Sequence, residues 1–168
     1  MPAHRDHSWG TRDWTAFHHY KWVCLQTEAG LAVNFTHALA LDRQFEWGYV
    51  TLDGVQAPIR SIKADVERDA RFYAYTSAGL LLKDELGREV EVQCLARKSL
   101  VSYPAGGLIL YDAVASCVSG GSDGVVYFQE GWVPEFIERR RASMPEHSNT
   151  EMGRRFVAKN KMVGKAST

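Results

Sequence analysis

Hydrophobic and polar residues alternate along most of this chain. In residues 31–41, one face carries Val33, Phe35, His37, Leu39 and Leu41, and the other carries small or polar residues. A repeat of two is the spacing of a β-strand, whose successive side chains point to opposite faces. Further alternating or apolar segments occupy residues 17–26, 44–52, 56–68, 70–82, 89–97, 108–118 and 124–132. The pattern therefore predicts about eight strands and almost no helix.

Turn residues separate these segments and set the fold class. Asp53-Gly54 is a strong signal for a two-residue hairpin, and glycine pairs at 106–107 and 120–121 flank the seventh segment. Short connections between consecutive strands favour an antiparallel meander, closed into a barrel or folded as a sandwich. About eight strands is the size whose interior either fills with side chains or holds one small ligand. We therefore predict an all-β domain over residues 1–135.

The strand pattern stops after Pro134. Residues 136–144 favour a short helical turn, and the following residues are expected to form a mobile, polar, basic tail. Residues 139–168 hold eight Lys or Arg residues and two acidic residues, whereas the whole chain has no net charge. We expect the tail to aid solubility or to dock onto the acidic body of its own or a neighbouring chain, before any phosphate or membrane contact.

Composition and short motifs argue against several classes of function for this chain. The balance of 20 basic and 20 acidic residues gives no case for nucleic-acid binding. No segment approaches the roughly 20 apolar residues needed to span a bilayer, and the N-terminus has no signal-peptide pattern. Three widely spaced cysteines, Cys24, Cys94 and Cys117, then favour reduced thiols in a cytoplasmic protein. No metal-ligand spacing, phosphate loop or dinucleotide fingerprint is present, so we expect no cofactor.

Three polar residues share a strand face with apolar neighbours. His37 lies between Phe35 and Leu39, Asp112 alternates with Leu110 and Val114, and Glu130 follows Val126 and Phe128. A buried carboxylate must be paired, hydrogen-bonded or protonated, and a protonated one is a general acid. Asp112 is therefore a candidate catalytic residue, and His37 and Glu130 are candidate ligand contacts. The structural alternatives are a hydrogen-bonded core histidine and arginine-paired carboxylates.

Aromatic residues form a second set of candidates. Several could face one cavity and line it for an apolar ligand; core packing is the alternative for most of them. The candidate ligand-binding aromatics are Trp9, Trp14, Trp22, Trp47 and Tyr111.

The densest group of chemistry-bearing residues runs from Arg5 to Trp14. Asp6 stands next to His7, and a carboxylate beside an imidazole can fix its tautomer and stabilise its charged form. Asp6 and His7 are therefore candidate catalytic residues. The structural alternative is a surface turn whose polar groups bond local backbone.

The sequence Asp-His-Ser-Trp-Gly at 6–10, followed by Arg12 and Trp14, resembles the signature of the lipocalin-like carotenoid 1,2-hydratase, tocopherol cyclase and Diels–Alderase group. Proteins of that group usually have two consecutive barrel-like domains, with this signature near the start of the second. The resemblance therefore implies a lipocalin-like barrel corresponding to the second half of such a protein. It also implies cofactor-free hydration, cyclisation or isomerisation of an apolar isoprenoid or polyketide, with Asp6 and His7 as the acid–base pair and Trp9 lining the pocket.

Two functions follow. In the first, the barrel binds an apolar small molecule, isoprenoid, polyketide or lipid-like, and transforms it by acid–base chemistry. In the second, it is a non-catalytic ligand-binding or interaction domain, in which residues 6–10 close one barrel end. A homodimer or a missing N-terminal half would then cover the surface that a partner domain covers in two-domain relatives.

Overall fold

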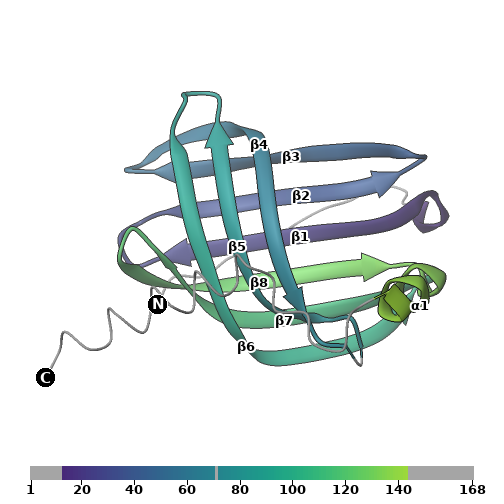
Figure 1. Ribbon diagram of the computed structural model, residues 1–168. Helices are drawn as coiled ribbons and strands as arrows, with labels where there is room; N and C mark the ends of the chain where they lie inside the picture. Colours follow the sequence, from purple (N-terminus) through teal and green to yellow (C-terminus); the bar gives the residue numbers. More distant parts are fainter. Residues whose placement is uncertain (1–12, 71, 144–168) are drawn as a thin grey trace, which may run out of the picture.

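The computed structural model describes residues 13–70 and 72–143, in which eight antiparallel strands close into a barrel in sequence order (Figure 1). The strands are β1 (Phe17–Thr27), β2 (Ala32–Ala40), β3 (Arg43–Leu52), β4 (Val55–Arg68), β5 (Tyr75–Asp84), β6 (Glu89–Ala105), β7 (Leu108–Ser119) and β8 (Ser122–Trp132). A 3-10 turn, η1 (Trp14–Ala16), precedes β1, and α1 (Pro134–Ser143) follows β8. The predicted all-β barrel is confirmed, and it is lipocalin-like.

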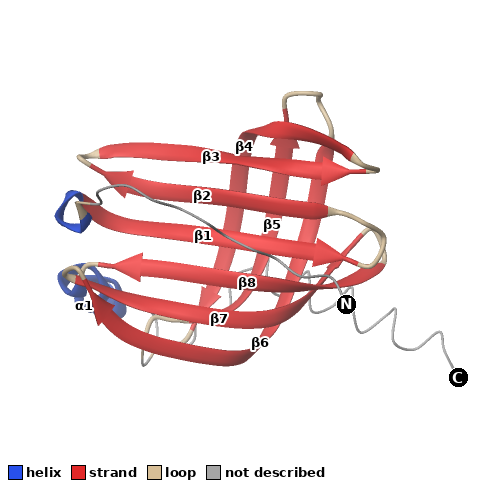
Figure 2. Ribbon diagram, turned by 180° about the vertical axis from the view of Figure 1, so that it is seen from behind, coloured by secondary structure: helices blue, strands red, loops and turns tan. Residues whose placement is uncertain are grey.

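Strand β6 belongs to both sides of the barrel. Its first half pairs with β5, and its second half pairs with β7 after register shifts at Arg97. Figure 2 shows β4 and β5 crossing behind the other strands at a steep angle. The sequence predicted that this strand ends at residue 97, and Pro104, which lacks an N–H group, lies in the part that the structure adds. Pro104 is accommodated because, among the described residues, the second half of β6 pairs with β7 alone.

Strand β5 begins at Tyr75, five residues later than predicted. The described residues between β4 and β5 instead form a loop, in which the Asp69 carboxylate accepts a hydrogen bond from the Phe72 N–H at 2.6 Å. Tyr73 takes a positive φ of 59°, which a strand does not allow. The loop lies at one end of the barrel, where it contributes to the site described below.

An apolar core fills the barrel between its two crossing sides. Val23, Phe35 and Phe128 are almost fully buried, and Tyr75 stacks on Phe128 with ring centroids 4.6 Å apart. All three cysteines are buried and form no disulfide in the described part of the chain. Burial also raises the pKa of the Cys117 thiol to about 11. The Cys117 thiol is therefore held in the unreactive protonated form.

Arg88 joins two hairpins at the end of the barrel away from α1. Its guanidinium Nε donates to the buried Asp84 carboxylate at 2.6 Å. The same guanidinium donates to the backbone carbonyls of Leu52 and Val55, in the β3–β4 hairpin, at 3.2 and 3.1 Å. Burial opposes ionisation of Asp84, but the hydrogen bonds from Arg88 outweigh it and lower the pKa of this carboxyl.

Asp84→Asn is expected to be less stable than the wild type at neutral pH, and the difference is expected to shrink in acid. A carboxyl whose pKa is lowered by folding contributes stability above its unfolded pKa and loses it as pH falls through the folded value. Urea unfolding at pH 7 and at about pH 3 measures this difference. The exposed Asp53 of the β3–β4 turn supplies the control, Asp53→Asn. A difference for Asp84→Asn that stays constant with pH would contradict the prediction.

Helix α1 covers the predicted helical turn. It lies at the barrel end where β8 finishes, and Phe136 stacks on Trp132 with ring centroids 5.0 Å apart. The expected basic tail lies outside the described residues. In the part of the chain that is described, no helix is long and apolar enough to cross a membrane.

Candidate functional site

A row of polar side chains crosses five neighbouring strands on the inner face of the barrel. Strand register pairs Glu46 with His37, His37 with Lys21, Lys21 with Glu130, and Glu130 with Tyr111. Direct cross-strand partners point to the same side of a sheet, with Cβ atoms about 5 Å apart. These five residues, the polar row, therefore lie side by side along one line.

The polar row stands directly next to the apolar core. On β2, β1, β8 and β7, the next inward-facing residue beyond the polar row is apolar. These residues are Phe35, Val23, Phe128 and Ala113, and none of them is more than 1 % exposed. Charged and apolar side chains thus meet at a sharp boundary inside one barrel end. The side chains of His37 and Glu46 remain 23 % and 26 % exposed, so solvent reaches the row from the β2–β3 side.

Arg68 enters the row from the opposite side of the barrel. Its guanidinium donates to both Glu130 oxygens, at 2.6 and 2.5 Å, and to the Tyr73 carbonyl at 3.0 Å. The guanidinium carbon also lies 4.8 Å from the centre of the Trp132 ring. The side chain of Arg68 is 7 % exposed and that of Glu130 is fully buried. Burial opposes the charge on Arg68, but Glu130 outweighs it and raises the pKa of the guanidinium.

Lys21 is left without a carboxylate. Glu130, its neighbour in the row, is bound on both oxygens by Arg68, and Lys21 has no hydrogen-bond or ion-pair partner among the described residues. Its amine lies 5.0 Å from the centre of the Trp132 ring, a cation–π contact. Burial lowers the pKa of Lys21 to about 8; Glu130 opposes this shift and Arg68 adds to it.

Two neutral imidazoles flank the amine. Burial first, and then the nearby basic side chains, lowers the pKa of His19 to about 3. Burial and Lys21 also lower the pKa of His37, although Glu46 lies 3.5 Å from its Nε2 and favours the charged form. The two rings stack with centroids 5.8 Å apart, and the Nδ1 atom of each is buried without a hydrogen-bond partner. Near neutral pH, His37 in the polar row and His19 next to it are therefore uncharged proton acceptors beside the amine.

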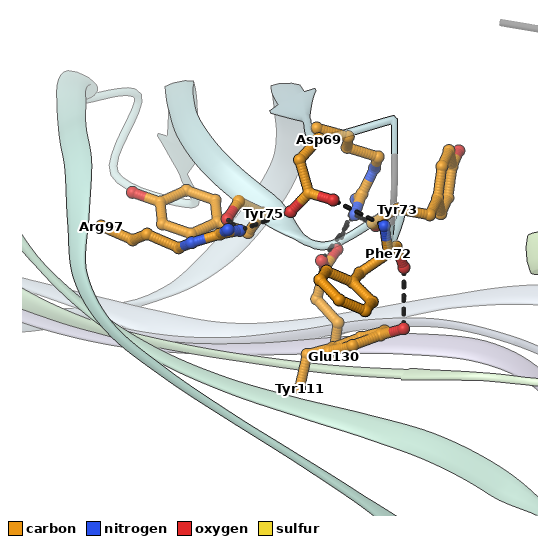
Figure 3. A network of polar contacts seen from close by, with 8 residues as sticks. Asp69, Phe72, Tyr73, Tyr75, Arg97, Tyr111 and Glu130 are labelled. Carbon is orange, nitrogen blue, oxygen red and sulfur yellow. Dashed lines mark hydrogen bonds and ion pairs between the residues drawn. The ribbon is translucent and has the colours of Figure 1, made fainter. Parts of the chain in front are cut away.

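Hydrogen bonds and an ion pair hold the loop between β4 and β5 over this end of the barrel (Figure 3). Tyr111 donates its hydroxyl hydrogen to the Phe72 carbonyl at 2.7 Å. Arg97 donates to the Asp69 carboxylate at 2.9 Å and to the Tyr75 carbonyl at 2.5 Å. These bonds fix the loop that supplies the Tyr73 carbonyl to Arg68, so they hold Arg68 against Glu130.

The structure brings together three of the residues singled out in the sequence. His37, Tyr111 and Glu130 all lie in the polar row, and for His37 and Glu130 this agrees with the face expected from alternation. Glu130 is paired with an arginine, Arg68, which is the structural alternative given for this carboxylate.

Other candidates lie on the outer face of the barrel. The Trp22 indole donates to the Asn34 side chain at 3.2 Å, and Trp47 is 53 % exposed. Asp112 accepts hydrogen bonds from Gln129 at 2.8 Å and from Tyr103 at 3.1 Å.

Trp14 also lies away from the polar row. It packs against Phe17 and Tyr20, with ring centroids 5.8 and 5.7 Å away. The sheet therefore separates Trp14, Trp22, Trp47 and Asp112 from His37, Tyr111 and Glu130. Asp6, His7 and Trp9 lie outside the described residues, and their roles stay predictions.

The sequence analysis did not single out Lys21, His19 or Arg68 as a site. Alternation from Val23 places Lys21 and His19 on the inner face, so a lysine and a histidine on a core face were a usable signal. Arg68 ends its strand and carried no such signal, because its contacts come from the crossing of β4 over β8. Within residues 13–70 and 72–143, no group of three or more His, Cys, Asp or Glu side chains is placed to hold a metal ion.

Comparison with solved structures confirms the fold. A protein of Nitrosomonas europaea that carries the provisional name AttH superposes with a TM-score of 0.51 at 16 % sequence identity. The match covers 68 % of this chain and 38 % of that one, so this chain spans well under half of its length. No curated protein matches the sequence. A family model described as a domain of unknown function, DUF7064, matches residues 1–134, and the chain therefore belongs to this family.

Proposed function

We propose that the barrel binds an apolar small molecule that carries one polar group, with that group at the polar row. The observation that carries the proposal is a set of polar atoms without partners at the edge of an apolar core. The Nδ1 atoms of His19 and His37 and the Trp132 indole nitrogen are buried without a hydrogen-bond partner in the described structure. The half-buried Lys21 amine beside them makes no hydrogen bond or ion pair with the described residues and contacts the Trp132 ring. Unpaired buried polar groups are costly, and a ligand group that pairs with them removes that cost.

The surrounding side chains suit an apolar ligand body. Trp132, Tyr73 and Phe136 form an aromatic cluster beside the row, with Tyr73 and Trp132 ring centroids 5.3 Å apart. Binding sites for small molecules combine mostly apolar walls with a few polar groups that fix orientation. The aromatic cluster beside the polar row supports the proposal on this ground.

The proposal also includes catalysis of a reaction of the bound molecule. The resemblance of residues 6–14 to the hydratase and cyclase group supports cofactor-free hydration, cyclisation or isomerisation, with Asp6 and His7 as the acid–base pair. The neutral imidazoles of His19 and His37 are further proton acceptors near the proposed ligand. Asp112 lies on the outer face, so a role as an acid requires a ligand on that side of the sheet.

Binding is tested with 11-(dansylamino)undecanoic acid, an apolar fluorescent probe with one carboxylate. We expect saturable binding that weakens about tenfold in Lys21→Met, because the carboxylate then loses its cationic partner. Lys98→Met removes an exposed lysine from β6 and is expected to bind like the wild type. Equal affinity in wild type and Lys21→Met, or no saturable binding, would overturn the proposal.

A second candidate function is self-association through β3. Beyond its hairpin end, residues 43–48 of β3 pair with β2 alone in the described structure, because the pairing with β4 is limited to residues 49–52. Phe45 and Trp47 on this edge are 36 % and 53 % exposed. An exposed apolar edge strand is a template for another strand.

A second copy of this chain is the occupant that fits the edge. If two β3 strands pair antiparallel about Phe45, Arg43 of each copy faces Trp47 of the other, a favourable cation–π arrangement. Light scattering with size-exclusion chromatography is expected to give a dimer for the wild type and a monomer for Trp47→Glu. A wild-type monomer at high concentration would exclude this function.

A further inference from the structure

The Lys21 amine differs from an ordinary buried lysine in its surroundings. Buried lysines are normally paired with a carboxylate. Here the neighbouring carboxylate, Glu130, is bound on both oxygens by the Arg68 guanidinium. The amine therefore lies beside the aromatic ring of Trp132 and makes no hydrogen bond or ion pair with the described residues.

Every element around the amine supplies a group that affects its charge. Strand β1 supplies His19, and β2 and β3 supply His37 and Glu46. On the other side lie Arg68 of β4, Tyr73 of the β4–β5 loop and Tyr111 of β7, with Glu130 and Trp132 of β8 between them. Arg68 neutralises the nearest acid, and the neutral imidazoles supply no negative charge. With the pKa of Lys21 at about 8, about a tenth of the amine is uncharged at pH 7.

We propose that Lys21 is a nucleophile that forms a reversible imine with an aldehyde or ketone, so that the barrel captures apolar carbonyl compounds covalently. This inference rests on the proposed function and names the polar group of its ligand as a carbonyl. An uncharged lysine amine in an aromatic, partly desolvated site is the form that attacks carbonyl carbons.

The reaction balances without an oxidant, reductant or cofactor. The amine lone pair forms the C–N bond, and the carbonyl π electrons move to oxygen. His37 accepts a proton from the attacking nitrogen and delivers it to this oxygen, which gives a carbinolamine. A proton from solvent then converts the hydroxyl group to water, which leaves as the nitrogen lone pair forms the C=N bond, and the product is the protonated imine. His37 is suited to this step because it is the cross-strand neighbour of Lys21 and its Nδ1 atom has no partner. Hydrolysis reverses the sequence and releases the carbonyl compound.

The test uses the full chain, decanal and sodium cyanoborohydride, which reduces an imine to a stable secondary amine. Peptide mass mapping is expected to find Lys21 alkylated at least about tenfold faster than Lys63 and Lys98, because these two side chains are exposed to water and lack the partly desolvated, aromatic surroundings of Lys21. The rate at Lys21 is expected to rise as pH increases to about 8 and then to level off. His37→Gln is expected to slow alkylation by a larger factor than it weakens the binding of decanol.

Two comparisons make the outcome decisive. Lys21→Arg keeps the positive charge and is expected to lose the fast adduct, whereas Lys98→Arg is expected to keep it. Decanol, which cannot form an imine, is expected to displace the dansyl probe and to protect Lys21 from decanal. Displacement by decanol with no preferred adduct at Lys21 would overturn the imine and leave the proposed function intact. Neither displacement nor adduct would overturn both.

Discussion

Glu130→Gln is expected to lower the free energy of unfolding by about 3–5 kcal/mol, the largest effect of any single side chain in the polar row. The substitution keeps the shape of the side chain but removes the charge that balances Arg68. The Arg68 side chain is 7 % exposed, so water cannot replace the lost partner. Urea unfolding followed by circular dichroism measures the change.

A double-mutant cycle separates the ion pair from the burial of Glu130 itself. Arg68→Met alone and Glu130→Leu alone are each expected to cost a similar amount, because each leaves one buried charge without its partner. The combination of Arg68→Met with Glu130→Leu is expected to recover most of the stability, since apolar residues of similar volume replace a buried pair at little cost. If the double variant lost the sum of the single losses, the two side chains would not be coupled. That result would contradict the role assigned to the pair.

The same cycle bears on Lys21. With Glu130 replaced by leucine and Arg68 by methionine, the amine loses both the attractive carboxylate and the repulsive guanidinium. Lys21 would then lie beside the imidazoles of His19 and His37, and burial would remain as the main influence on the pKa of its amine. The alkylation experiment in this background therefore shows whether burial alone keeps the amine reactive.

Alternation was sufficient to predict the fold and part of the site. It identified all eight strands, and it placed His37 and Glu130 on the inner face, because a period of two fixes the face of every residue in an uninterrupted strand. It failed where the backbone departs from that period. The loop at 69–74 looks like strand in composition, but the Asp69 hydrogen bond and the positive φ of Tyr73 end the pairing.

The partners of the site residues could not be predicted from the sequence. Lys21 and Glu130 are adjacent in the row because β1 pairs with β8, a contact between the first and last strands that exists only once the barrel closes. Arg68 reaches Glu130 because β4 crosses the other side of the barrel. Neither contact has a local signal in the chain, so the pairing that frees the Lys21 amine appears only in three dimensions.

Gly48→Ala is expected to lower the free energy of unfolding by about 3 kcal/mol and to disturb the β2–β3 end of the polar row. Gly48 stands opposite Phe35 and has a φ of 155°. A Cβ atom there would lie 2.2 Å from the Asn34 carbonyl oxygen and 2.6 Å from the Phe35 Cα, both backbone atoms. Rotation of a side chain cannot relieve this contact, so β2 and β3 must separate.

Gly30→Ala is the matched control, because Gly30 has a φ of 88° but open space around its Cα. Its cost is expected to be about 1 kcal/mol, from backbone strain alone. The strands that Gly48 joins also carry His37 and Glu46, so Gly48→Ala is expected to weaken binding of the dansyl probe, while Gly30→Ala leaves it unchanged. Equal losses of stability in the two variants would show that the close approach of β3 to β2 does not hold this part of the row in place.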